Sequence, residues 1–252
     1  MPFAFPDRGR LGLSPPGTCR AYARAVPAIL LARHGQASFG ASVYDVLSAD
    51  GAVQAAALAD ELDRRNLTVE RVVCGGLARQ RDTAIPIAQA FGVEIARDSR
   101  WDEYEMDDIL QSHSDTAVRV NSAPGEHRPH VSSREFQDIL EAAVLEWIRA
   151  GGDGPARETW PMFQDRVVAA LHDLAARAAS GTTPIVVTSG GVISAVCIEL
   201  LSLPSESFIA FNRVAVNTGL TKLIHGRRGS TLVSFNEHGH LERGERSLVT
   251  YR

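Results

Sequence analysis

The chain has 252 residues, 44% of them hydrophobic, which suits one large α/β domain or two small ones with a sizeable core. Its formal net charge of −4 gives no general attraction to nucleic acid or to an anionic membrane, so a bound anion must be held by local arginines. The three cysteines, Cys19, Cys74 and Cys197, are widely spaced without a C-x-x-C pattern, which argues against a disulfide framework or thiolate metal site and favours a reducing, cytoplasmic setting.

The first 26 residues differ in composition from the rest of the chain. They contain four prolines among Gly and Arg and lack the apolar core of a signal peptide. We expect residues 1–26 to be a disordered N-terminal extension and residues 27–252 to form one domain. No apolar run approaches the length of a membrane span, so no membrane partner is expected.

Residues 28–38, A-I-L-L-A-R-H-G-Q-A-S, combine an apolar run with an abrupt basic end. The run is typical of a strand covered on both faces, and Gly35 lets the backbone turn sharply and approach a ligand. Ligands of open α/β sheets bind beyond the carboxyl ends of strands, where Arg33 and His34 lie. A guanidinium can hold a phosphoryl group while a neutral imidazole attacks phosphorus, although the tripeptide alone also fits an ordinary strand-to-loop corner.

Strand and helix patterns alternate in the next part of the chain. A helical spacing of apolar residues follows Ser48, its predicted N-cap. Strand patterns at residues 69–74 and 93–96 flank a helical pattern at residues 79–91, which Pro86 interrupts or kinks. Such alternation favours a mostly parallel sheet with helices on both faces.

An acidic cluster, W-D-E-Y-E-M-D-D at residues 101–108, ends this alternation. The polar region that follows contains one helix, predicted to begin at Ser132 with Glu135 completing a capping box. We interpret residues 104–158 as a helical insertion over the site. An amphipathic helix through residues 163–174 returns the chain to the sheet.

A second strand-to-helix junction follows. Residues 184–188, P-I-V-V-T, have the pattern of a fully buried strand, and S-G-G at residues 189–191 leads into a predicted helix at residues 192–203. Peptide N–H groups at a helix start can bind phosphate, helped by the helix dipole. Further strands are predicted at residues 213–217, 221–224 and 231–235. Together the elements predict a three-layer α/β/α sandwich with a mostly parallel central sheet.

Several motifs occur in a fixed order along the chain. They are R-H-G-Q at 33–36, L-S-A-D-G-A-V-Q-A at 47–55, G-G-L-A-R-Q-R-D-T-A at 75–84, V-N-T-G-L-T at 216–221 and F-N-E-H-G-H-L at 235–241. Over roughly residues 27–241 this series resembles the histidine phosphatase superfamily, the phosphoglycerate mutase-like proteins. The ordered series is far more specific than any single motif.

The resemblance implies a role for each residue that matches the motifs. It makes His34 the nucleophile that becomes phosphohistidine, with Arg33 and Arg79 binding the phosphoryl oxygens. Two guanidiniums can neutralise those oxygens without a metal or other cofactor. The predicted phosphate-binding set is completed by residues that follow the two strand ends: Gln36, Ser189 and Gly190.

The predicted general acid comes from the acidic cluster. W-D-E here corresponds to an L-x-E pattern of the family, which makes Glu103 the candidate that protonates the leaving oxygen and then activates water. The neighbouring carboxylates Asp102, Glu105, Asp107 and Asp108 compete for this role, and a solvated loop face is the alternative reading of most of them.

The chain departs from the family pattern at the second junction. Family members usually carry H-G-G where this chain has Ser189 before two glycines. A hydroxyl can hydrogen-bond to phosphate but supplies no positive charge and no proton in the neutral range. Another histidine could fill the space, and His225, His238 and His240 are candidates. The family's acidic loop ending in Glu-Gly is also absent after Glu103.

Two weaker signals have structural interpretations. The spacing of His127 and His130 could bind a metal, but their polar, Pro-rich surroundings favour a solvated loop. Trp101, Trp147 and Trp160 could line a pocket, but tryptophan is more often part of the core.

The sequence therefore predicts a metal-independent phosphatase that acts on a small phosphorylated metabolite through phospho-His34. A mutase on the same fold is one alternative, and a phosphate-binding protein with lost or weak turnover, because Ser189 replaces the second histidine, is the other. The expected partner is the small phosphorylated substrate, with no nucleic acid, and formation of a homodimer is left open.

Overall fold

The computed structural model describes residues 27–38, 45–112, 133–243 and 247–251, and its centre is a six-stranded sheet in the order β3-β2-β4-β1-β5-β6. The first four strands in this order pair in parallel, and the last two add antiparallel pairs. The strands are β1 (Ala28–Arg33), β2 (Val72–Cys74), β3 (Ile95–Arg97), β4 (Ile185–Thr188), β5 (Leu220–Gly226) and β6 (Gly229–Glu237).

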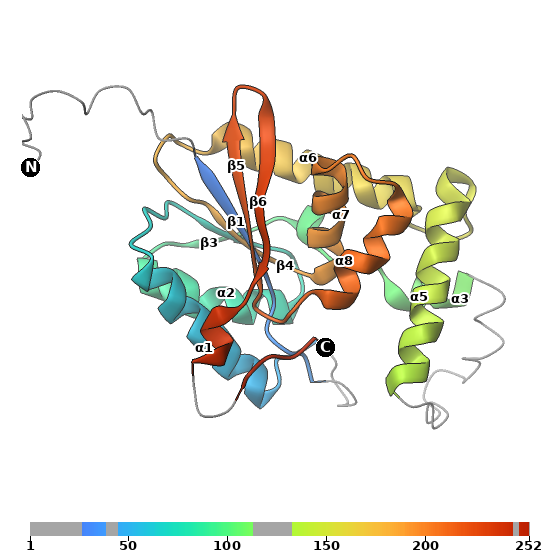
Figure 1. Cartoon of the computed structure of the whole chain (residues 1–252), viewed down its shortest axis with the longest axis horizontal. Coiled ribbons are helices and arrows are strands. Elements are labelled where there is room, and N and C mark those ends of the chain that lie inside the picture. Colours follow the sequence, from blue (N-terminus) through green and yellow to red (C-terminus); the bar gives the residue numbers. More distant parts are fainter. Residues whose placement is uncertain (1–26, 39–44, 113–132, 244–246, 252) are drawn as a thin grey trace, which may run out of the picture.

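Helices cover both faces of this sheet (Figure 1), as expected for the α/β/α fold. The longer helices are α1 (Ala49–Arg64), α2 (Ala78–Phe91), α3 (Met106–Ser112), α5 (Ser133–Ala150), α6 (Trp160–Arg177), α7 (Gly190–Leu200) and α8 (Phe208–Val214). Short 3-10 turns occur at Ser99–Trp101, Gly151–Asp153, Ser205–Ser207 and Gly239–Glu242. Within the described ranges, no helix has both the length and the apolar character needed to cross a membrane.

The alternating side chains of β1 divide the core into two clusters. Leu30 and Ala32 pack with α1 and α2, whereas Ile29 and Leu31 pack with α6, α7 and the aromatic residues beneath the insertion. Successive side chains of a strand point to opposite faces, so one apolar run serves both layers. Burial of β1 on both faces confirms the sequence interpretation, and its carboxyl end is thereby held by the whole core.

The tryptophans belong to this core, as predicted. Trp101, Trp147 and Trp160 are at most 4% exposed. Trp147 and Trp160 make an edge contact with 5.3 Å between ring centroids, and both contact Phe163 of α6. Offset and edge contacts of this kind stabilise aromatic clusters. The cluster attaches α5 and α6 to the sheet.

Most element predictions agree with the structure within a few residues. Ser48 caps α1, because its Oγ accepts a hydrogen bond from the Gly51 N–H at 3.0 Å. Helix α2 continues through Pro86 without interruption. Helix α5 begins at Ser133, next to the predicted start. Residues 1–26, Ser132 and the pair His127 and His130 lie outside the described residues.

The strand predicted at residues 213–217 is wrong. Arg213 and Val214 form the last turn of α8, and Thr218 has a left-handed φ of 58°. The β-branched valines of this stretch suggested a strand, but Phe208 and Ile209 bury one side of a short helix instead. The chain then turns into β5 at Leu220.

Candidate active site

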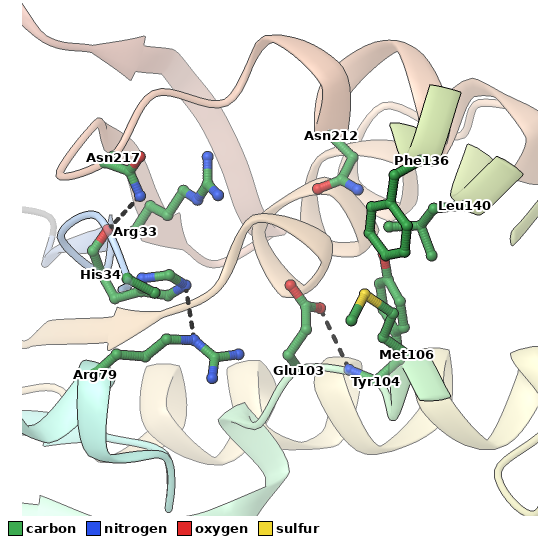
Figure 2. Close-up of a pocket in the computed structure, with 11 residues that line it drawn as sticks. Arg33, His34, Arg79, Glu103, Tyr104, Met106, Phe136, Leu140, Asn212 and Asn217 are labelled. Atoms are coloured by element: carbon green, nitrogen blue, oxygen red, sulfur yellow. Dashed lines mark hydrogen bonds between the residues drawn. The ribbon is translucent and has the colours of Figure 1, made fainter. Parts of the chain in front are cut away.

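A cavity of about 120 Å³ lies at the carboxyl end of β1. It has two chemically different halves, which Figure 2 shows side by side. The polar half is formed by Arg33, His34, Arg79 and Asn217, and the apolar half by Tyr104, Met106, Phe136 and Leu140. Glu103 and Asn212 lie between the two halves, and Ala37 completes the lining.

His34 follows the last residue of β1 and is 5% exposed. Its ring Nδ1 lies 2.7 Å from the carbonyl oxygen of Gly35, and Nε2 lies 3.1 Å from Arg79 Nε. A carbonyl only accepts and a guanidinium only donates, so the proton is on Nδ1 and the lone pair is on Nε2. The imidazole is therefore oriented with its basic nitrogen beside Arg79.

The surroundings of His34 keep the ring neutral. Burial lowers its pKa well below the usual 6.5, and the positive charges of Arg79 and Arg33 lower it further, while the Gly35 carbonyl opposes them. A neutral imidazole is a nucleophile through the lone pair of its unprotonated nitrogen. His34 is thus held in the protonation state that an attack on phosphorus requires.

Arg79 lies in the first turn of α2, where Asp45 orients it. The Asp45 carboxylate accepts a hydrogen bond from Arg79 Nη1 at 2.7 Å and one from the Ala78 N–H at 2.7 Å. Asp45 therefore binds both the helix start and the guanidinium. Carboxylate–arginine pairs of this kind fix the direction of the donor fork, and here Arg79 is directed at His34 (Figure 2).

Arg33 is held by backbone carbonyls from two distant segments. Its Nη1 donates to the carbonyl oxygens of Ala215 and of Tyr251, the latter at 2.6 Å. The last described segment reaches the site in a second way, because the Thr250 hydroxyl donates to Asn217 Oδ1 at 2.9 Å while Asn217 Nδ2 donates to the His34 carbonyl at 3.1 Å. Thr250 and Tyr251 thus help to hold the end of β1 in place.

Glu103 lies across the cavity from His34 (Figure 2). Its Oε2 accepts a hydrogen bond from the Gly191 N–H at 3.0 Å, and its Oε1 accepts one from the Tyr104 N–H at 3.3 Å. Burial raises the pKa of this carboxyl, although these hydrogen bonds and the charges of Arg79 and Arg33 oppose the shift. A carboxyl with a raised pKa can retain a proton and donate it.

The first turn of α7 explains how Glu103 is held. A Cβ on Gly191 would lie 2.2 Å from Glu103 Oε1, so the glycine is required for the carboxylate to reach the helix start. The helix dipole favours negative charge at this position. The N-terminus of α7, predicted to bind phosphate, therefore binds Glu103 through its Gly191 N–H.

Ser189 and Gln36 do not line the cavity. Ser189 is fully buried, and its Oγ accepts a hydrogen bond from Gln80 Nε2 at 2.9 Å. The Gln36 side chain accepts a hydrogen bond from the Ser48 hydroxyl at the start of α1. Gly190 lies close behind the lining, since a Cβ there would be 2.8 Å from Asn212 Oδ1. The structure thus brings His34, Arg33, Arg79 and Glu103 together, but not the whole predicted set.

The other carboxylates of the acidic cluster do not line the cavity. Asp102 accepts a hydrogen bond from the Gly76 N–H, and Asp108 pairs with Arg157 at 3.0 Å. Glu105 and Asp107 are exposed. The geometry therefore favours Glu103 among these candidates for a proton donor.

No described histidine occupies the place of the second family histidine. Nδ1 of His225 contacts Ser230 Oγ in the β5–β6 hairpin, and Nδ1 of His238 donates to the Asn236 carbonyl. His240 Nε2 lies 3.0 Å from the Thr218 hydroxyl, and burial lowers the pKa of this histidine to about 4. Within the described ranges, no group of three or more His, Cys, Asp or Glu side chains could hold a metal ion.

Sequence reasoning missed several polar contributors to the site. Asp45 and Asn212 carried no motif, and the Tyr251 carbonyl is a backbone group without a sequence signal. Asn217 belongs to V-N-T-G-L-T, so that motif could have indicated its contact with the end of β1. Residues that reach a site from distant segments of the chain are hard to identify unless a motif marks them.

Comparisons with known proteins agree with this architecture. The histidine phosphatase superfamily (branch 1) matches residues 29–238. The chain is similar to phosphoserine phosphatase from Entamoeba histolytica in complex with 3-phosphoglyceric acid, with 22% identity, a TM-score of 0.60 and coverage of 85% of this chain and 99% of that chain. It is also similar to mycobacterial glucosyl-3-phosphoglycerate phosphatase, with 22% identity, a TM-score of 0.57 and coverage of 83% and 98%. No curated protein matches the chain.

Proposed function

Because the chain belongs to branch 1 of the histidine phosphatase superfamily, we propose that it is a metal-independent phosphatase that hydrolyses the phosphate monoester of a small metabolite through phospho-His34. The observation that carries this proposal is the state of the His34 ring, whose Nδ1–H is held by the Gly35 carbonyl while Nε2 lies beside Arg79. Phosphoryl transfer depends chiefly on positioning and on neutralising charge, and the polar half offers both.

In the first step, Nε2 of His34 attacks phosphorus. The N–P bond forms as the P–O bond to the alcohol breaks, and the Glu103 carboxyl gives its proton to the departing oxygen. The imidazolium that results is stabilised by its Nδ1–H bond to Gly35. The products are the free alcohol, phospho-His34 and an ionised Glu103.

In the second step, the Glu103 carboxylate accepts a proton from water while the water oxygen attacks phosphorus. The N–P bond breaks, inorganic phosphate leaves and the neutral His34 ring is restored. Glu103 is again protonated, so atoms and charges balance over the cycle. Its position across the cavity from His34 suits a group that serves first as acid and then as base (Figure 2).

The two arginines neutralise the transferred group. Arg79 Nε donates to His34 Nε2 at 3.1 Å, so substrate binding must replace this contact with hydrogen bonds to phosphoryl oxygens. Release of the contact frees the lone pair for attack at the moment when phosphate arrives. Arg33, fixed by two carbonyls, supplies the second positive charge.

Hydrolysis of p-nitrophenyl phosphate, measured with and without EDTA, tests the proposal. We expect turnover that is unaffected by EDTA and competitively inhibited by vanadate. Loss of activity in EDTA would contradict the metal-independent mechanism. Vanadate binding without turnover would instead support the phosphate-binding alternative, and transfer of phosphate between positions of phosphoglycerate would support the mutase.

A further inference from the structure

The apolar half of the cavity is a wall of side chains that pack against the core. Tyr104 and Leu140 are at most 7% exposed, and Met106 and Phe136 pack against the main core cluster. The Tyr104 ring lies 5.5 Å from Trp147 between centroids, so the wall is anchored in the aromatic core. Packed aromatic and aliphatic side chains of this kind bind apolar ligand groups.

The position of Glu103 places the alcohol of the substrate against this wall. If the phosphoryl group occupies the polar half, the ester oxygen must point toward the proton donor, which lies at the border between the halves (Figure 2). The carbon skeleton beyond that oxygen then enters the apolar half. Its contacts there are the side chains of Tyr104, Met106, Phe136 and Leu140.

The charges around the cavity are arranged unequally. Among the described lining residues, the cations are Arg33 and Arg79, and both belong to the polar half. Two described arginines in or near the insertion pair with carboxylates outside the cavity: Arg157 with Asp108 and Arg213 with Glu141. Against the described lining residues, a second anionic group on the substrate would lose hydration in the apolar half without gaining an ion pair.

We infer, on the basis of the proposed function, that the preferred substrate is a phosphate monoester of an uncharged, largely apolar alcohol, such as a branched alkyl or benzyl-type alcohol. Its hydrocarbon part packs against the apolar half while its phosphate binds the polar half. Esters that carry a carboxylate near the phosphate, as in phosphoserine, are disfavoured. The neutral amide of Asn212, between the halves, can serve a hydroxyl but does not compensate a charge.

The test compares kcat/KM for benzyl phosphate and 3-methylbutyl phosphate with kcat/KM for O-phosphoserine and glycerol 3-phosphate. All four are esters of primary alcohols, so differences in leaving-group chemistry are small. We expect the two apolar esters to be preferred by about tenfold or more, the effect of burying a few methylene groups. Equal values, or a preference for phosphoserine, would overturn the inference, whereas hydrolysis of none of them would contradict the proposed phosphatase itself.

A charge placed in the apolar half provides a second test. Phe136→Arg adds a cation to the wall, and Gln137→Arg adds the same charge one position along α5, at a residue that does not line the cavity. We expect Phe136→Arg to lower kcat/KM for benzyl phosphate and raise it for phosphoserine, changing their ratio by about a hundredfold. The ratio should stay at the parent value in Gln137→Arg. An unchanged ratio in Phe136→Arg, in a variant with a parent-like circular dichroism spectrum, would place the alcohol elsewhere.

Discussion

The carboxyl ends of the neighbouring strands β1 and β4 are used in different ways. Arg33 pairs with Thr188 in the parallel register, and the His34 N–H donates to the Thr188 carbonyl at 2.8 Å, so the two ends are adjacent. The end of β1 lines the cavity with Arg33 and His34, whereas Ser189, at the end of β4, is buried against Gln80.

The second junction therefore holds Glu103, the candidate proton donor, in place. Its Gly191 N–H binds the Glu103 carboxylate at 3.0 Å. A helix N-terminus attracts any nearby anion, and in this fold a side-chain carboxylate takes that position. We therefore expect substitutions at the end of β1 to affect chemistry strongly and substitution of Ser189 to affect it little.

The largest effect is expected for His34→Ala. Removal of a nucleophile costs roughly a thousandfold or more in kcat. The fold should remain intact, because His34 is at the end of β1 and its backbone, not its ring, makes the contacts with Thr188 and Asn217. Initial rates on p-nitrophenyl phosphate measure the loss, and parent-like activity would remove His34 from the mechanism.

Glu103→Gln is expected to lower kcat/KM by about a hundredfold, within the usual range for general acid–base catalysis. In the parent, kcat/KM should fall as pH rises through the raised pKa of Glu103, because the proton donor is lost. It should also fall as pH drops through the lowered pKa of His34, because the nucleophile becomes protonated. The pH profile of Glu103→Gln should lack the alkaline decline, and retention of that decline would assign it to another group.

Arg79→Ala should weaken binding of vanadate by about ten- to a hundredfold, equivalent to the roughly 1.5–3 kcal/mol of a charged hydrogen bond. Arg81→Ala is the matched control, because Arg81 lies on the same helix and pairs with Asp82. Competitive inhibition by vanadate measures both variants. Equal inhibition constants in Arg79→Ala and Arg81→Ala would exclude Arg79 from the phosphate contacts.

The smallest effect on activity is expected for Ser189→Ala. The hydroxyl accepts a hydrogen bond from Gln80 and does not line the cavity, so kcat/KM should stay within about twofold of the parent. The free energy of unfolding should fall by about 1–3 kcal/mol, since the buried Gln80 amide loses an acceptor. Urea titration and steady-state kinetics together test this. A tenfold fall in kcat/KM with unchanged stability would show that Ser189 contacts the phosphate.

The sequence could predict the parts of the site that depend on local pattern. The apolar run before Arg33 and the glycines before Arg79 place Arg33 at the end of β1 and Arg79 at the start of the helix that follows β2. The carboxyl ends of parallel strands meet at one edge of the sheet, so the two residues lie close together. The direction of the Ser189 side chain depends on Gln80, 109 residues earlier in the chain, and no local pattern encodes that contact.

Distant contacts also limited the fold prediction. The valines of residues 213–217 indicated a strand, yet the packing of Phe208 against Trp160 and Tyr104 supports a helix that continues to Val214. Tertiary packing of this kind overrides weak β-propensity. The same helix brings Asn212 to the cavity, so one missed element also concealed one lining residue.

The phosphoenzyme is the most direct test of the proposed chemistry. Rapid acid-free quenching of the parent enzyme during turnover, followed by digestion and mass spectrometry, should reveal a phosphoryl group on the peptide that contains His34, labile in acid and stable in base. The label should be absent from His34→Ala treated in the same way. A phosphoryl group on a serine or aspartate, or burst-free turnover with no labelled peptide, would contradict the assignment of His34 as the nucleophile.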